Sequence, residues 1–150
     1  MPLRRFFAAV LLAGFVLNEI WEMALMSFYV ETAGQPWMNS LGMCTRAAAG
    51  DVGIILAIYA TGALAAGDAG WGLRGRWNIY GAAALLGLAA AALAEHAALA
   101  AGRWAYADRM PVVPWLGAGL WPLLQMTLLA PLTFWLAYRW AGRGARRFSS

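Results

Sequence analysis

Carboxylate residues occur inside stretches of the sequence that are otherwise apolar. Glu19 and Glu22 lie in the first such stretch, Asp51 lies in the second, and Glu95 lies in the third. A charged side chain at the centre of a bilayer costs about 2.5–3.5 kcal/mol on insertion scales, so each of these residues marks a candidate functional site. Carboxylates in such positions can bind a cation or take up and release a proton.

Neighbouring polar residues extend this set. Glu19 and Glu22 are three positions apart, which places them on one face of a helix together with Asn18. His96 follows Glu95 directly, and Gln125 lies near the middle of a fourth apolar stretch. These positions therefore predict a polar site built from several helices.

The composition excludes an ordinary soluble domain. Of the 150 residues, 63% are hydrophobic and only 12% are charged, whereas soluble domains are about 45–50% apolar and about 25% charged. The formal net charge of +4 comes from arginines that cluster at the ends of apolar stretches. This arrangement is typical of membrane topology, so we expect no nucleic acid partner and instead a lipid bilayer around the chain.

Four stretches are long enough to cross a bilayer, because a helical span needs about 20 mostly apolar residues. We predict an all-α polytopic membrane protein, a bundle of four transmembrane helices forming one domain over residues 1–150. We expect the first span to be uncleaved, since no small-residue cleavage site follows Leu17. Prolines in the fourth span predict kinks or an interrupted first turn. The predicted spans are residues 6–30, 47–66, 79–101 and 112–141.

The third predicted span is composed almost entirely of Ala, Leu and Gly. Small residues at these spacings allow a neighbouring helix to approach closely. We therefore predict that this span is the central packing helix. The small residues concerned are Gly81, Gly87, Ala91, Ala94 and Ala98.

The arginines predict the orientation in the membrane. The larger group falls on the side that holds both termini: Arg4, Arg5, Arg74, Arg76, Arg139, Arg143, Arg146 and Arg147. The smaller group falls on the other side: Arg46, Arg103 and Arg109. The positive-inside rule then predicts that both termini are cytoplasmic. A composition rich in Ala, Gly and Arg without Lys suggests a bacterium with a GC-rich genome, hence the inner membrane.

This orientation predicts that the polar residues converge on one pocket in the outer half of the membrane. The loop of residues 102–111 would cover that pocket from outside, and its Met-Pro-Val-Val-Pro continuation would stiffen the cover. The candidate binding residues are Asn18, Glu19, Glu22, Asp51, Glu95, His96, Trp104, Tyr106, Trp121 and Gln125.

Each candidate also has a purely structural interpretation. Glu19 and Glu22 can be protonated and hydrogen-bonded to Asn18 or Gln125, which would set the helix register. Asp51 can be a carboxylate favoured by the helix dipole or a partner of Arg46. Glu95 and His96 can be hydrated at the interface, and Gln125 can be an interhelical bridge.

These residues support three functional hypotheses. The first is a protein that binds or translocates a small cationic or amphiphilic molecule, or a proton. The second is an intramembrane enzyme acting on a lipid or isoprenoid, with Glu95 and Asp51 as acid and base. The third is a subunit that pairs with a second copy or another membrane protein. We expect neither a metal nor a cofactor, because His96 and Cys44 are the only residues of their kinds.

Overall fold

The computed structural model describes residues 2–146, with side chains for residues 3–142. Four long α-helices account for most of it: α1 (Pro2–Leu25), α2 (Trp37–Ala66), α3 (Trp77–Ala100) and α4 (Leu120–Arg146). Each is long and apolar enough to cross a membrane, which confirms the prediction of an all-helical chain and suggests a multi-pass membrane protein. Arg147 and the side chains of Arg143 and Arg146 lie outside the described residues.

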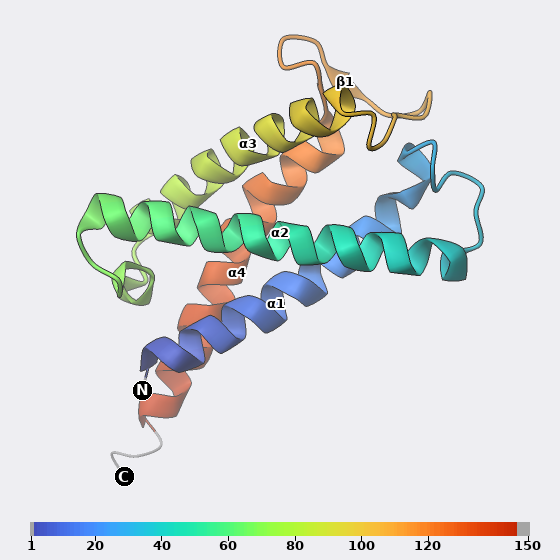
Figure 1. The fold of residues 1–150 in the computed structure, drawn as a ribbon. Helices are drawn as coiled ribbons and strands as arrows, with labels where there is room; N and C mark the ends of the chain where they lie inside the picture. The colour runs from blue at the N-terminus through green and yellow to red at the C-terminus, as the bar shows by residue number, and fades with distance from the viewer. Residues whose placement is uncertain (1, 147–150) are drawn as a thin grey trace.

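Helix α4 is the central helix, contrary to our prediction for the third span. It packs closely against α1 on one side and α3 on the other. Helix α2 crosses the other three, with extensive contact to α1 and little contact to α4 (Figure 1). The space left where α2 diverges from α4 is where the cavity described below lies.

Helix α2 begins at Trp37, earlier than the expected start of the second span at residue 47. Asn39, Thr45 and Arg46 lower the hydropathy of this segment, but a helix requires a consistent buried face rather than continuous apolar sequence. That face is present, because Ser40, Cys44 and Ala48 recur every four residues and are all buried.

Residues 112–119, which we expected to lie in the fourth helix, instead form an antiparallel hairpin. Strands β1 (Val112–Val113) and β2 (Ala118–Gly119) pair Val112 with Gly119 and Val113 with Ala118. Pro114 lacks an N–H group, and Gly117 adopts a φ of 58°, so both residues suit the connecting turn. Helix α4 begins directly afterwards at Leu120.

The two ends of the bundle are built differently. At the end that holds both termini, the rings of Phe6, Tyr59, Trp71 and Phe134 form a packed aromatic cluster. The indole N–H of Trp71 donates to the carbonyl of Tyr59 at 3.0 Å. Trp71 opens the short 3₁₀ helix η2 (Trp71–Arg74), which connects α2 to α3.

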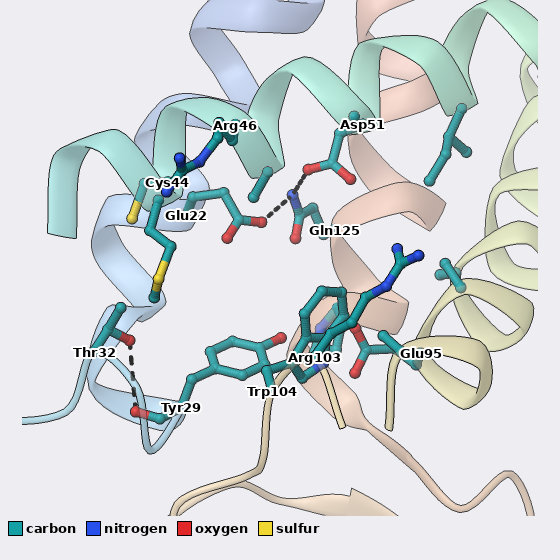
Figure 2. Close-up of a pocket in the computed structure, with 18 of the residues that line it drawn as sticks. Glu22, Tyr29, Thr32, Cys44, Arg46, Asp51, Glu95, Arg103, Trp104 and Gln125 are labelled. Carbon is teal, nitrogen blue, oxygen red and sulfur yellow. Dashed lines mark hydrogen bonds between the residues drawn. The ribbon is translucent and has the colours of Figure 1, made fainter. Parts of the chain in front are cut away.

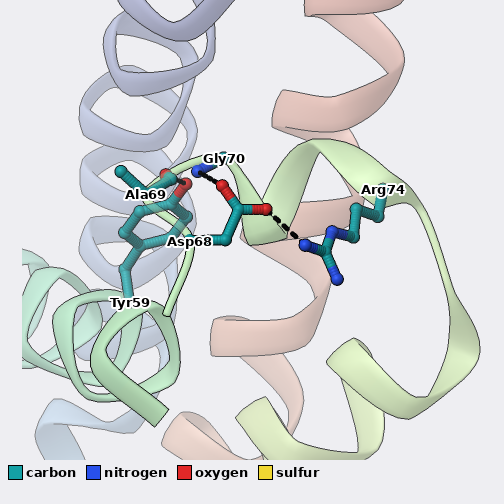
Figure 3. Close-up of polar contacts among 5 residues, drawn as sticks. All are labelled: Tyr59, Asp68, Ala69, Gly70 and Arg74. Carbon is teal, nitrogen blue, oxygen red and sulfur yellow. Dashed lines mark hydrogen bonds and ion pairs between the residues drawn. The ribbon is translucent and has the colours of Figure 1, made fainter. Parts of the chain in front are cut away.

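Asp68 holds this connection in place (Figure 3). Its carboxylate accepts the backbone N–H of Gly70 at 2.8 Å and the guanidinium of Arg74 at 2.6 Å. These two contacts lower the pKa of Asp68 below its ordinary value. A lowered pKa stabilises the fold above the ordinary pKa of aspartate, and this contribution is lost as the pH falls through the lowered pKa.

At the opposite end, the loop after α3 pairs with the end of the first helical segment. The 3₁₀ helix η1 (Met26–Phe28) continues α1, and Tyr29 forms an isolated β-bridge with Tyr106. The backbone N–H of Val30 donates to Ala105, and that of Ala107 donates to Phe28, both at 2.9 Å. The loop therefore forms a fixed cover over this end.

Part of the small-residue face of α3 packs against neighbouring helices. Gly87, Ala91 and Ala98 are buried against neighbouring helices, whereas Gly81 has open space around it. A Cβ atom at position 87 would lie 2.4 Å from the backbone oxygen of Met126 in α4. Only glycine permits this close approach of the two helices.

We predict that Gly87→Ala destabilises the protein by about 1–3 kcal/mol, because the added methyl group overpacks the contact between α3 and α4. Thermal unfolding of the purified protein in a mild detergent measures the change. Gly81→Ala, on the same helix and with no atom near its Cβ position, is the matched control and should unfold as the wild type does. Equal unfolding temperatures for the two variants would contradict the predicted packing.

Candidate functional site: an acid-lined cavity between the four helices

A cavity of about 540 Å³ lies between the four helices, beneath the cover formed by the α3–α4 loop (Figure 2). Four of its lining residues are carboxylates. Three come from helices: Glu22 of α1, Asp51 of α2 and Glu95 of α3. The fourth, Glu31, is exposed and accepts the backbone N–H of Ala105 at 2.9 Å. Most of the remaining lining is apolar and includes Met26 and Ile54. The cavity thus combines acidic groups with an apolar wall.

Gln125 of α4 connects two of the carboxylates. Its amide nitrogen Nε2 lies 2.9 Å from Oε1 of Glu22 and 2.7 Å from Oδ2 of Asp51. The same nitrogen lies 3.0 Å from Oδ1 of Asn18. One buried glutamine therefore joins α1, α2 and α4 at a single atom.

Asn18 determines which way this amide faces. Its Nδ2 group donates to the carbonyl of Gly14 at 2.7 Å, so its Oδ1 atom is the one that faces Gln125. An oxygen requires a donor opposite it, and the NH₂ group of Gln125 supplies that donor. Asn18 is completely buried and lies behind the cavity wall, where it positions Gln125.

The NH₂ group of Gln125 faces more acceptor oxygens than it has hydrogens. An amide NH₂ group carries two hydrogens, but Asn18, Glu22 and Asp51 each present an oxygen to it within 3.0 Å. At least one of these oxygens therefore needs a hydrogen or a positive charge from another source. A bound proton or a cationic ligand in the cavity would supply it.

Glu95 forms a second acidic centre on the α3 wall. It is only 5% exposed, and it accepts a hydrogen bond from the phenol of Tyr106. The same phenol oxygen accepts the backbone N–H of Gly119 at 2.8 Å. Burial and the contact with Glu95 raise the pKa of Tyr106, so the phenol remains a donor. The cover and β2 thereby hold the Glu95 carboxyl in place.

The structure separates Glu19 from Glu22. Three residues of helix rotate the side chain to a position roughly 60° away, which is enough for Glu22 to line the cavity while Glu19 faces α2. There Glu19 accepts a hydrogen bond from the hydroxyl of Thr45 at 3.0 Å. Glu19 is not a lining residue, so Glu22 is the one of the two glutamates that faces the cavity.

Two other expected residues also lie outside the cavity. His96 is exposed, because the residue after Glu95 points about 100° further around α3. Trp121 packs its ring against Phe28 with centroids 5.7 Å apart. Trp104 does line the cavity, whereas Tyr106 contacts it through Glu95. Of the predicted binding residues, those facing the cavity are Glu22, Asp51, Glu95, Trp104 and Gln125.

Sequence reasoning did not assign several of the lining residues to the site. Tyr29 lies against Trp104, with ring centroids 6.3 Å apart and nearly perpendicular planes. Arg46 and Arg103 line the same cavity, although we considered Arg46 only for orientation and as a partner of Asp51, and Arg103 only for orientation and as part of the covering loop. These two arginines could have been assigned to the site because they lie close in sequence to Asp51 and Trp104. Within the part of the chain that the structure describes, three or more potential metal ligands do not cluster.

We predict that Gln125→Met lowers the free energy of unfolding by about 1–3 kcal/mol, because Asn18 and the two carboxylates lose a buried hydrogen-bond donor. Methionine has a similar length and no N–H group. Thermal unfolding in detergent measures this loss, with Gln35→Met in the exposed loop before α2 as the control. Wild-type unfolding of Gln125→Met would show that these contacts are not stabilising.

The sequence matches no protein-family model, and no curated protein or solved structure was found to be similar to it. The arguments for function therefore rest on the residues around the cavity and on their chemistry.

Proposed function

We propose that this chain binds, and translocates, a small amphiphilic cation in the acid-lined cavity. The observation that carries the proposal is the excess of acceptors around Gln125, where one NH₂ group faces Asn18, Glu22 and Asp51. An ammonium group placed between Glu22 and Asp51 would supply a positive charge to the oxygens that lack a hydrogen.

The rest of the cavity favours an amphiphile over a bare metal ion. Ligand pockets have volumes of roughly 300–1,000 Å³ and mainly apolar walls with a few placed polar groups. A cavity of about 540 Å³ with methionine and alanine side chains around the carboxylates fits this description. Trp104 and Tyr29 add ring faces, which attract cationic groups.

In this proposal, translocation depends on the exchange of the bound cation for a proton. When no cation is bound, a proton can occupy the same carboxylates, so that cation and proton compete for one site. A carrier that alternates between these two occupants would exchange one for the other across the membrane. This proposal includes both termini in the cytoplasm, the cavity in the outer half of a bacterial inner membrane, and the arginine-rich end inside.

We predict that Glu22→Gln and Asp51→Asn each weaken binding of decyltrimethylammonium by about tenfold, which corresponds to about 1.4 kcal/mol. Each variant removes one negative charge from the cavity and keeps the side-chain shape. Isothermal titration of the protein in an uncharged maltoside detergent measures the affinity.

Asp108→Asn is the matched control for this experiment. Asp108 is exposed in the covering loop and does not line the cavity, so its variant should bind within twofold of wild type. If Glu22→Gln and Asp51→Asn bind the probe as tightly as Asp108→Asn does, the cavity does not bind cations through these carboxylates.

A second candidate function is favoured by the presence of acidic groups on two walls of one cavity. Asp51 lies on the α2 wall, and Glu95, with its donor Tyr106, lies on the α3 wall. An intramembrane enzyme could use Glu95 as the acid and Asp51 as the base on a lipid or isoprenoid held between them. The covering loop would keep water from this reaction.

We predict, for this enzymatic alternative, that cells lacking the gene accumulate a lipid and that Glu95→Gln fails to reverse the accumulation. His96→Gln is the control, because His96 is adjacent in sequence but exposed and outside the cavity. Comparison of total lipid extracts by mass spectrometry measures the effect. Lipid extracts identical to wild type in the deletion strain would exclude the enzymatic function.

A further inference from the structure

Two arginines share the acid-lined cavity. Arg46 is on α2 and Arg103 follows α3, and both are exposed while lining the cavity. Figure 2 shows them on different sides of the carboxylates, with Arg46 above Glu22 and Arg103 below Gln125. The exposed margin of the cavity therefore carries two arginines and Glu31, whose carboxylate accepts the backbone N–H of Ala105, while the inner wall carries Glu22, Asp51 and Glu95.

Neither arginine is neutralised by the carboxylates nearby. Among the side chains that the structure describes, the ion pair found is that of Arg74 with Asp68 at the opposite end of the bundle. Glu22 and Asp51 are directed to Gln125, and Glu95 is directed to Tyr106. The guanidinium groups of Arg46 and Arg103 thus retain their hydrogen-bond donors for a ligand.

Membrane topology does not account for these two positions. Arginines concentrate at the end that holds both termini, and Arg46 and Arg103 belong to the small group at the other end. The third member of that group, Arg109, is exposed and does not line the cavity. Two of three arginines at the arginine-poor end therefore border the one cavity whose buried wall is acidic.

This arrangement restricts the ligand. A molecule that carries only positive charge would be repelled by the two arginines as it approached the carboxylates. A molecule that carries an anionic group beside its cationic group would be attracted at both places. Guanidinium groups form paired hydrogen bonds with phosphate oxygens, and carboxylates in an apolar cavity bind ammonium.

We propose that the ligand is a zwitterionic amphiphile of the phospholipid-headgroup type, with its phosphate at one of the two arginines and its ammonium group against Glu22 and Asp51. This inference rests on the proposed binding function and names the ligand class for the same cavity. The apolar chain of the ligand lies along the methionine and alanine side chains of the wall.

Two probes with the same apolar chain test the inference. Decylphosphocholine carries a phosphate and a quaternary ammonium group, whereas decyltrimethylammonium carries the ammonium group alone. We expect the wild-type protein, titrated in an uncharged maltoside detergent, to bind decylphosphocholine at least about tenfold more tightly. Equal or tighter binding of decyltrimethylammonium would overturn the inference.

Arginine variants test the role assigned to the cavity margin. At least one of Arg46→Gln and Arg103→Gln, the one that removes the phosphate contact, should reduce the preference for decylphosphocholine by about tenfold and strengthen binding of decyltrimethylammonium. Arg109→Gln is the matched control and should keep the wild-type preference. Arg46→Lys and Arg103→Lys keep the charge and should retain most of the preference. An unchanged preference in both glutamine variants, with wild-type unfolding temperatures, would overturn the inference.

Failure of this inference is distinguishable from failure of the proposed function. If Glu22→Gln weakens binding of both probes while the arginine variants change nothing, cation binding stands and the phosphate assignment is wrong. If Glu22→Gln and Asp51→Asn leave both probes unaffected, the binding function itself is wrong. Phosphocholine without a chain is the last probe, and binding as tight as that of decylphosphocholine would overturn the assignment to an amphiphile.

Discussion

The amide of Gln125 is the interaction on which the rest of the site depends. Its nitrogen is the only point at which groups from α1, α2 and α4 meet among the described hydrogen bonds, and it lies where α2 has little other contact with α4. In an apolar interior a polar group without a partner is costly. The same contacts that satisfy Gln125 therefore determine where α2 crosses the bundle, and they leave two carboxylates with fewer hydrogens than acceptor oxygens. Structural support and binding capacity come from one residue.

The fold combines a closely packed end with an end that contains a cavity. Gly87 brings the backbones of α3 and α4 together, and the aromatic cluster around Phe6 and Phe134 fills the end that holds both termini. The cavity lies toward the other end, where its lining includes Arg103 and Trp104 of the covering loop. The bridge from Tyr106 to Glu95 and Gly119 then fixes the cover to the cavity wall. The packed end and the acid-lined cavity thus occupy opposite ends of the bundle.

The sequence predicted the helical class and the convergence of Glu22, Asp51, Glu95 and Gln125, because buried polar residues in apolar helices have few partners available other than one another. It did not predict the details that depend on rotation about a helix axis. Glu19 and Glu22 looked equivalent at three-residue spacing, yet one faces Thr45 and the other faces the cavity. Hydropathy also placed the start of α2 too late and assigned the hairpin of residues 112–119 to a helix. The start of α2 depends on a buried face that recurs every four residues, and this face is set by tertiary contacts. The hairpin depends on the turn geometry of a proline followed by a positive-φ glycine. Hydropathy measures neither of these.

The positions of the charged side chains determine which ligands the cavity favours. Glu22, Asp51 and Glu95 lie on the inner wall, where Gln125 and Tyr106 hold them. Arg46 and Arg103 lie at the exposed margin, where they have no ion-pair partner among the described residues. If the arginines had paired with the carboxylates, the paired groups would no longer be available to a charged ligand. Because Glu22 and Asp51 are directed to an amide on α4 instead, the two kinds of charge remain separate. Separation of opposite charges across one apolar cavity favours a cationic ligand that also carries an anionic group over one that carries the cationic group alone.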